Sequence, residues 1–281
     1  MQSLVFAAVL FASACHAGWN ALIKVGLDPL SVTTLIAVGA AAASLIGLPL
    51  AGVPAPPAWP WLAASATIHL LYFAALIESY RIGDLGQVYP IARGSAPLMT
   101  AIASVTFVGE HLSLLGWSGI VTIAAGVLLL SVRGGRGIAQ LHRRAVGYAL
   151  LTALTICAYT ITDGVGVRLS RNPPAYVLWL FLGNATALVP YALWRDRKSV
   201  MAALRRFWLR GLAGGALQVL SYGIALWAMT LAPIALVASL RETSVLFGVI
   251  IAVLVLQEPL RIVRVAAAAL IVSGLVLIRL Q

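Results

Sequence analysis

The chain contains an internal duplication, in which residues 85–132 align without a gap with residues 233–280, at a spacing of 148 residues. In each copy an arginine lies inside an apolar run, a glutamate follows where the run ends, and a glycine comes later. An internal repeat constrains the fold strongly, because both copies are expected to adopt the same local structure. The aligned pairs are Arg93 with Arg241, Glu110 with Glu258, Leu112 with Leu260 and Gly126 with Gly274.

The composition places this duplicated chain in a membrane. Of its 281 residues, 62% are hydrophobic and only 10% are charged, whereas a soluble domain carries about 25% charged residues. The net charge of +11 comes from short segments between the apolar runs, so anionic lipid head groups are a better counter-charge than nucleic acid. Cys15 and Cys157 both lie in apolar segments and do not indicate a disulfide framework.

Ten apolar runs are long enough to cross a bilayer, since a spanning helix needs about 20 mainly apolar residues. No segment alternates with a period of two, which favours a helical bundle over a barrel. The first run has no basic region before it and no clear cleavage site, so we expect it to be kept as a membrane helix. The predicted helices are 3–23, 31–51, 59–80, 85–108, 113–132, 145–167, 176–194, 207–230, 233–256 and 262–280.

Five helices per half imply an inverted repeat, because a half with an odd number of spans leaves the next half to enter from the opposite side. The predicted halves are residues 1–132 and 145–281, joined by a basic linker over 133–144. Inverted repeats related by an axis in the membrane plane are typical of secondary transporters, whose site lies between the halves near the midplane. We therefore predict an all-α membrane protein with ten transmembrane helices, built as two inverted five-helix repeats that form one domain.

Arg93 and Arg241 are the main candidates for a binding site. A charge at their depth in a membrane helix costs several kcal/mol unless it finds a partner or water, which marks it as functional. Two arginines facing one cavity would suit a carboxylate or another anion, which a guanidinium group binds in a bidentate manner. The alternative is an ion pair with Glu242, Glu78 or Asp163 that only holds helices together.

Polar and aromatic stripes on several helices are expected to face the interior, because lipid would not favour them. Tyr89 shares a helical stripe with Arg93, and His69 shares one with Tyr72. A core histidine and ordinary aromatic packing are the alternatives for these residues. The predicted substrate-binding residues are Arg93, Arg241, Tyr89, His69, Tyr72, Trp19, Asn20, Tyr159 and Tyr222.

Three carboxylates, those of Glu242, Glu78 and Asp163, are candidates for proton coupling. Glu78 also lies three residues before Arg81 and could pair with it on the helix surface. His69 is a further group able to relay a proton.

Other features have expected structural roles. Glu110 and Glu258 lie at helix ends, where capping or pairing near the interface is expected. Gly126, Gly274 and the pair Gly211 and Gly215 are expected at helix contacts. The sequence has no glycine-rich phosphate loop and no His/Cys metal spacing, so we expect no ATP drive, no metal and no cofactor.

Four short segments resemble those of a known family of carriers. They are Asn-Ala-Leu-Ile-Lys at 20–24, Val-Tyr-Pro-Ile-Ala-Arg at 88–93, Gly-Glu-His-Leu at 109–112 and Leu-Gln-Glu-Pro-Leu at 256–260. With Gly126 and Gly274, they make the chain similar to the EamA branch of the drug/metabolite transporter superfamily. The resemblance covers essentially the whole chain and implies a ten-helix secondary carrier that exports amino acids, other small metabolites or drugs by alternating access.

The two indicators of orientation disagree. Loops after odd-numbered helices hold fourteen Lys and Arg residues and the opposite side holds three, which places the crowded side in the cytoplasm and both termini outside. The resemblance implies that both termini face the cytoplasm.

We expect a secondary active transporter, an exporter in the plasma (inner) membrane, for a small organic metabolite such as an amino acid, a carboxylate or a drug-like solute. Its expected partners are the solute, membrane lipids and, if transport is proton-coupled, protons; nucleic acid is not expected, and the protein would be a monomer or weak dimer. The alternative is an intramembrane enzyme acting on a lipid-linked substrate, which would need a catalytic cluster near the head groups. A non-transporting subunit or receptor is a third reading.

Overall fold

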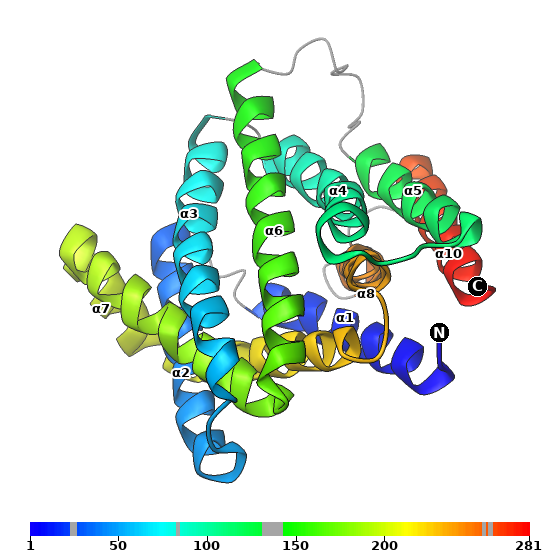
Figure 1. The fold of residues 1–281 in the computed structure, drawn as a ribbon. Coiled ribbons are helices and arrows are strands. Elements are labelled where there is room, and N and C mark those ends of the chain that lie inside the picture. The colour runs from blue at the N-terminus through cyan, green and yellow to red at the C-terminus, as the bar shows by residue number, and fades with distance from the viewer. Residues whose placement is uncertain (23–26, 83–84, 131–142, 255–256, 258–260) are drawn as a thin grey trace.

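The computed structural model describes residues 1–22, 27–82, 85–130, 143–254, 257 and 261–281, with side chains outside 77–90. Every regular element in these ranges is a helix (Figure 1). The elements are α1 (Ser3–Leu22), α2 (Pro29–Ala51), the 3₁₀ turn η1 (Pro56–Ala58), α3 (Trp59–Ile82), α4 (Leu85–Ala103), the π turn η2 (Ser104–Val108), α5 (Leu114–Leu129), α6 (Arg143–Ser170), α7 (Pro173–Met229), α8 (Ile234–Arg241), α9 (Ser244–Leu254) and α10 (Ile262–Arg279).

The outer surface of these helices suits lipid. Ile46, Leu50, Phe107 and Leu114 are each at least 79% exposed, which would be costly in water. Eight stretches of the described chain are long and apolar enough to cross a membrane, and α5 is a shorter apolar helix. The expectation of an all-helical, multi-pass membrane protein is therefore confirmed for the described residues.

α7 differs from the prediction, which placed a loop between helices 176–194 and 207–230. Helical structure continues through that loop, and only Asp196 (φ −152°, ψ 77°) and Phe207 (φ −122°, ψ 21°) leave it. The two turns divide α7 into segments 173–195, 197–206 and 208–229. A straight helix of 57 residues would be about 85 Å long, far more than the roughly 30 Å of hydrocarbon. The basic loop is thus a short helix, which begins where Asp196 Oδ1 accepts a hydrogen bond from Ser199 N at 3.1 Å.

The predicted continuous helix over 233–256 is interrupted. It stops at Arg241 and resumes at Ser244. Val245 N donates to Glu242 O at 3.0 Å and Leu246 N donates to Thr243 O at 2.9 Å, which are the shorter-range bonds of a 3₁₀ turn. Such a turn in the middle of a helix is frequent at hinges. No proline or glycine marks the interruption in the sequence.

Glycines bring the last helix of each half together, as expected from their alignment. A Cβ added at Gly126 on α5 would lie 2.9 Å from Ala267 O on α10, and one at Gly274 would lie 2.8 Å from Gly119 O. Neither distance leaves room for a side chain, so the two helices meet backbone to backbone.

A second close approach joins α2 to α7. A Cβ added at Gly39 would overlap Gly211 O, and one at Gly211 would lie 3.0 Å from Leu35 O. Gly215 also packs on Gly39 and Ala40. The prediction that Gly211 and Gly215 lie at a helix contact is confirmed.

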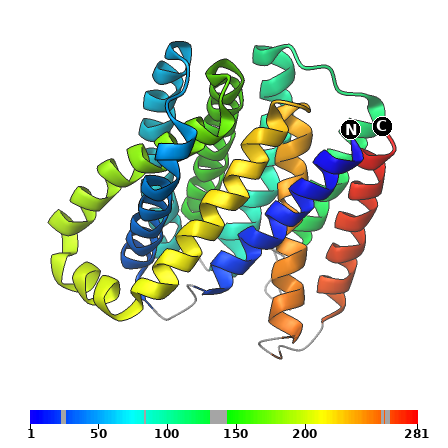
Figure 2. The same cartoon turned by 90° about the horizontal axis from the view of Figure 1, so that it is seen from below.

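The two ends of the described chain lie together, at one face of the bundle (Figure 2). The Met1 amino group donates to Gln281 O at 3.4 Å, and Ser113 Oγ donates to Gln281 Oε1 at 2.7 Å. Arg279 also donates to Met1 O. α1 packs along the last part of α7, and α3 and α4 pack on α6, so helices of both halves enclose the centre of the bundle.

Candidate functional site

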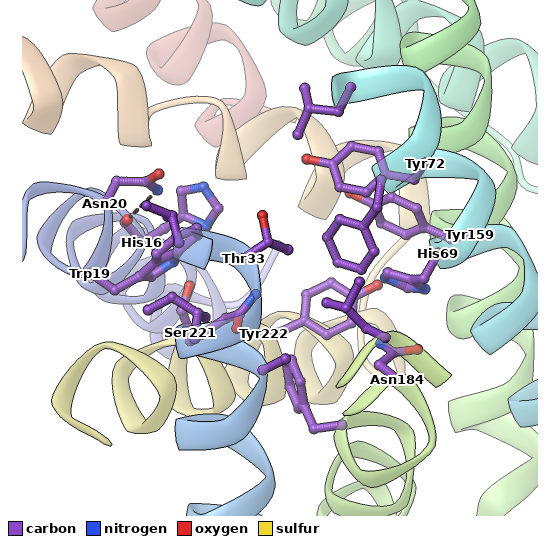
Figure 3. A pocket seen from close by; sticks show the side chains of 18 of the residues that line it. His16, Trp19, Asn20, Thr33, His69, Tyr72, Tyr159, Asn184, Ser221 and Tyr222 are labelled. Atoms are coloured by element: carbon purple, nitrogen blue, oxygen red, sulfur yellow. Dashed lines mark hydrogen bonds between the residues drawn. The ribbon is translucent and has the colours of Figure 1, made fainter. Parts of the chain in front are cut away.

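A cavity of about 310 Å³ lies between the two halves. Its walls come from α1, α2, α3 and α4 of the first half and from α6, α7 and α8 of the second. Figure 3 shows His16, Trp19 and Asn20 on one wall and His69, Tyr72 and Tyr159 on the facing wall. Among the predicted substrate-binding residues, those that line it are Arg93, Arg241, His69, Tyr72, Trp19, Asn20, Tyr159 and Tyr222. The side chain of Tyr89 lies outside the described residues.

Arg93 is paired across the two halves. Its Nε lies 3.0 Å from Glu242 Oε2, and both side chains are at least nine-tenths buried. Its Nη2 also donates to Ser244 Oγ at 3.5 Å. The structure thus contains one of the ion pairs that the sequence left open, and it joins α4 to the interruption between α8 and α9. A buried pair of this kind fixes geometry more than it adds net stability, because desolvation offsets the attraction.

Arg241 is placed differently, although it aligns with Arg93 in the duplication. Its guanidinium carbon lies 4.7 Å from the centroid of the Tyr222 ring, a distance at which the ring face attracts a cation. Among the side chains that the structure describes, no carboxylate lies within ion-pair distance of Arg241. This cation therefore faces the cavity with a ring beside it, and without a carboxylate at ion-pair distance among the described side chains.

Tyr222 is held by Asp163 on α6. The Tyr222 hydroxyl donates to Asp163 Oδ2 at 2.6 Å, and the hydroxyl of the fully buried Tyr176 donates to Oδ1 at 3.0 Å. Asp163 is itself fully buried and lies behind the cavity wall rather than in it. Its contribution is to orient the ring that supports Arg241.

An aromatic wall forms one side of the cavity. The His69 and Tyr159 rings are stacked with centroids 4.3 Å apart, and Tyr72 meets Tyr159 edge-on at 5.7 Å. His69 Nδ1 lies 2.9 Å from Ser65 O on its own helix. The histidine therefore lines the cavity and is hydrogen-bonded within α3, a combination of the two roles that the sequence left open.

Apart from the ion-paired atoms of Arg93 and Glu242, Trp19 Nε1 and Asn184 Oδ1 are buried in this region without a hydrogen-bond partner in the described structure. Asn184 is 8% exposed and lines the cavity from α7. A buried amide oxygen without a donor is costly, so Asn184 is suited to accept a hydrogen bond from a bound molecule. In contrast, Asn20 Nδ2 already donates to His16 O at 2.8 Å.

The sequence interpretation did not single out Asn184, Thr33, Gln218 or Ser221, all of which line the cavity. Asn184 had a usable signal, because it is an amide inside the apolar run 176–194, where a polar side chain usually faces the bundle interior. The others are small or uncharged, and nothing in the sequence separates them from similar residues elsewhere.

The cavity reaches one face of the bundle, where its lining residues Asn20 and Pro29 are exposed. Further along α6, an ion pair joins the two halves. Arg168 lies nine residues beyond the lining residue Tyr159 on α6, about 13 Å along the helix axis. There its Nη2 donates to Glu110 Oε1 at 2.6 Å.

Glu110 and Arg168 also bind the region where α7 ends and α8 begins. Glu110 Oε1 also accepts from Ile234 N at 2.9 Å, at the first turn of α8. Arg168 donates further to Met229 O and Ala232 O, at 2.8 and 3.1 Å. The expected capping and pairing role of Glu110 is confirmed, and it links α6 with α8. Glu258 lies outside the described residues.

The predicted proton-coupling residues differ in their surroundings. Glu242 is paired with Arg93, Asp163 accepts two tyrosine hydroxyls, and the side chain of Glu78 is not among those described. The described part of the chain has no group of three or more His, Cys, Asp or Glu side chains arranged to hold a metal.

This fold and cavity define a helical, multi-pass membrane protein with a polar and aromatic chamber between two related halves. The chain belongs to the EamA-like transporter family, which matches residues 3–132 and 143–280. The two matches fall on the two halves, and they confirm the resemblance found in the sequence. The description of this family names transport.

Two further similarities agree with this membership. The chain is 39% identical over 74 residues to an "Uncharacterized transporter in cobO 3'region" from Sinorhizobium sp; the match covers 26% of this chain and about half, 52%, of that protein. It also resembles a solved structure described only as "Crystal structure of protein", with a TM-score of 0.74 and 18% identity over 99% of this chain and 96% of the other. The second similarity concerns the fold alone.

Proposed function

We propose that this protein is a secondary active transporter of the plasma membrane that exports a small organic carboxylate, such as an amino acid or a carboxylate drug-like solute. The observation that carries the proposal is Arg241, a cation that faces a cavity between the halves and has a tyrosine ring beside it. A bidentate carboxylate would complete its interactions. The export direction follows from the family resemblance.

The remaining lining supports a solute with an apolar or aromatic body. A volume of about 310 Å³ lies at the lower end of the range for small-molecule sites. Tyr72, Tyr159 and Tyr222 offer ring faces and edges, and Asn184 Oδ1 would accept a hydrogen bond from an ammonium or amide group. We assign Arg241 to the carboxylate, Asn184 to a donor group and the aromatic wall to the body of the solute.

The proposed topology has ten spans in two inverted repeats. It counts α7 as two spans, 173–195 and 208–229, and counts α8 with α9 as one interrupted span. Support comes from the length of α7 and from its two non-helical residues, Asp196 and Phe207. Discontinuous helices beside a central site are typical of secondary transporters, and here the interruption follows directly after Arg241.

The proposed mechanism is alternating access between the two halves. We infer that the present state opens beside the exposed lining residues Asn20 and Pro29, and that the contact of Glu110 with Arg168 closes the other end. Opening that end requires Glu110 to release Arg168 and the first turn of α8. The 3₁₀ turn at Glu242 and Thr243 is the proposed hinge. Movement of α8 would therefore shift Arg241, its last residue, and alter the Arg93–Glu242 pair.

Solute counterflow in proteoliposomes tests this proposal. Purified protein would be reconstituted and loaded with a panel of unlabelled amino acids and other small carboxylates, and uptake of each labelled compound would be measured. We expect exchange for a subset of carboxylates, and its loss in Arg241→Ala but not in Arg144→Ala, which changes an exposed arginine at the start of α6. Exchange that is equal in all three proteins would remove Arg241 from the site. Failure of every carboxylate, with exchange of a neutral or cationic solute, would contradict the carboxylate assignment.

A further inference from the structure

The helical segment 197–206, between the two long parts of α7, is strongly basic. Asp196, the acidic residue beside it, uses Oδ1 to accept from Ser199 N. The segment is amphipathic, since Val200 and Ala203 are buried. The exposed cations of the segment and its flanks are Arg195, Arg197, Lys198, Arg205, Arg206 and Arg210. Figure 2 shows this stretch of α7, in yellow-green, turning back at the edge of the molecule.

Two of these cations contact the same aromatic ring. The guanidinium carbons of Arg206 and Arg210 lie 5.3 and 5.7 Å from the centroid of the same ring, that of Phe207. Arg205 is adjacent in sequence, and within the described ranges none of the three has a carboxylate at ion-pair distance. Like charges gathered in this way repel one another unless an anion lies among them.

An apolar cleft begins next to these arginines. It has a volume of about 120 Å³ and lies between α2 and α7, with walls from Leu35, Val38, Leu204, Trp208 and Leu212. Trp208 is 55% exposed, and tryptophan is enriched at the level of lipid head groups. The cleft therefore lies beside the basic segment and against residues 35–39 of α2.

We propose that this segment and cleft bind an anionic phospholipid. The phosphate would lie among Arg205, Arg206 and Arg210, and one acyl chain would fill the cleft beside Leu204 and Trp208. Charge complementarity selects an anionic head group, because clustered arginines beside a membrane helix are typical of such contacts. The adjoining apolar cleft favours a lipid over a free phosphate, which would leave the cleft empty.

The bound lipid would lie directly behind the transport cavity. On α2, Ile36 and Thr33 line the cavity, whereas Leu35 and Val38 line the cleft. On α7, Trp208 and Tyr222 belong to the same segment, 208–229, and line the cleft and the cavity respectively. The residues of the lipid site are separate from those of the cavity, so the site does not depend on the identity of the solute.

Native mass spectrometry of the full chain in a non-ionic detergent tests the proposal. The probes are phosphatidylglycerol, phosphatidylcholine with the same acyl chains, and glycerol phosphate without chains. We expect one phosphatidylglycerol to stay bound, and to bind at least tenfold more tightly than phosphatidylcholine, since each arginine adds about fivefold at an anionic head group and three are present. Equal retention of the two lipids, or equal binding of glycerol phosphate, would overturn the proposal.

Matched variants locate the site. Replacing Arg205, Arg206 and Arg210 together by Gln should weaken phosphatidylglycerol binding by about tenfold or more. The control replaces Arg143 and Arg144 by Gln, two exposed arginines at the start of α6, and should leave binding unchanged. An equal loss in the control would show that only diffuse positive charge is at work, and would contradict the proposal.

A second variant covers the case in which the triple change prevents folding. Val38→Phe keeps every charge and fills the cleft, so it should reduce retention of the long-chain lipid. Thermal unfolding without added lipid would verify that each variant is folded. Normal retention of phosphatidylglycerol by folded Val38→Phe would exclude the cleft as the acyl-chain site.

Discussion

Nε of Arg93, from the first half, lies 3.0 Å from Oε2 of Glu242, from the second half, and both side chains are buried. The duplicated counterpart of Arg93 is Arg241, the residue directly before Glu242. Glu242 therefore pairs with Arg93, the arginine of the other copy. Arg241, which precedes Glu242 in the chain, lies over the Tyr222 ring instead. Two arginines that align in sequence are thus unequal in charge environment.

Removing Arg241 should impair binding of the solute more than it affects folding. Arg241→Ala is expected to weaken apparent affinity by about 10- to 100-fold, since a hydrogen bond to a charged group contributes about 1.5–3 kcal/mol. Arg241→Lys should recover part of this loss, because a lysine retains the charge without the bidentate fork. The measurement is concentration-dependent counterflow in proteoliposomes. Unaltered affinity in Arg241→Ala would assign the carboxylate to another residue.

Breaking the Arg93–Glu242 pair from one side should destabilise the protein. Arg93→Leu leaves a buried carboxylate without its partner, at a cost of about 3–5 kcal/mol. Replacing both residues by Leu should cost clearly less than the sum of the single changes. Chemical unfolding in detergent for the four proteins of this cycle measures the coupling free energy. Strict additivity would mean that the pair does not contribute as a unit.

Asn184 should distinguish solutes by their donor groups. Asn184→Leu removes the amide oxygen, so transport of solutes with an ammonium or amide N–H should fall by about tenfold, while that of carboxylates without such a donor should hardly change. Thr186→Val is the matched control, because Thr186 is on the same helix and is exposed. Competition between paired labelled solutes measures the ratio. A uniform loss for both solute types would indicate a packing effect instead.

Weakening the contacts of Glu110 should open the end of the cavity that we propose to be closed. In Glu110→Gln the carboxylate charge is lost, so both the ion pair with Arg168 and the bond from Ile234 N become weaker. A cysteine placed at the fully buried Ala235, in a protein whose Cys15 and Cys157 are replaced by Ala, should then react faster with a water-soluble thiol reagent. The same cysteine in a chain with intact Glu110 is the control. Equal reaction rates would argue against Glu110 as part of the gate.

The all-helical membrane architecture could be predicted from the sequence. Long apolar runs have few ways to satisfy their backbone in lipid other than as helices, and the duplication relates the two halves. Gly126 and Gly274 could be placed at helix contacts because each stands at the same offset as the arginines. The helical nature of 197–206 was missed because its charge suggested a loop, yet the segment contains no proline or glycine.

The finer features of the site were harder to predict. Spacing along a sequence indicates which residues share a helix face, but not which of three carboxylates comes within reach of Arg93. The interruption after Arg241 also had no signal, since Glu242 and Thr243 are compatible with a helix. What distinguishes the interruption is a tertiary contact, because Glu242 is bound to Arg93 and Ser244 accepts from the same guanidinium.

The unequal surroundings of the two arginines have a kinetic consequence. In an alternating-access cycle the cavity would open to one side of the membrane and then to the other. Because Arg241 belongs to only one half, the residues around it would differ between these two states. A solute would then meet a different affinity from each side of the membrane, as half-saturation constants measured in opposite directions would reveal. The two halves would then be similar in shape because of the duplication, yet the solute would bind more readily from one side of the membrane.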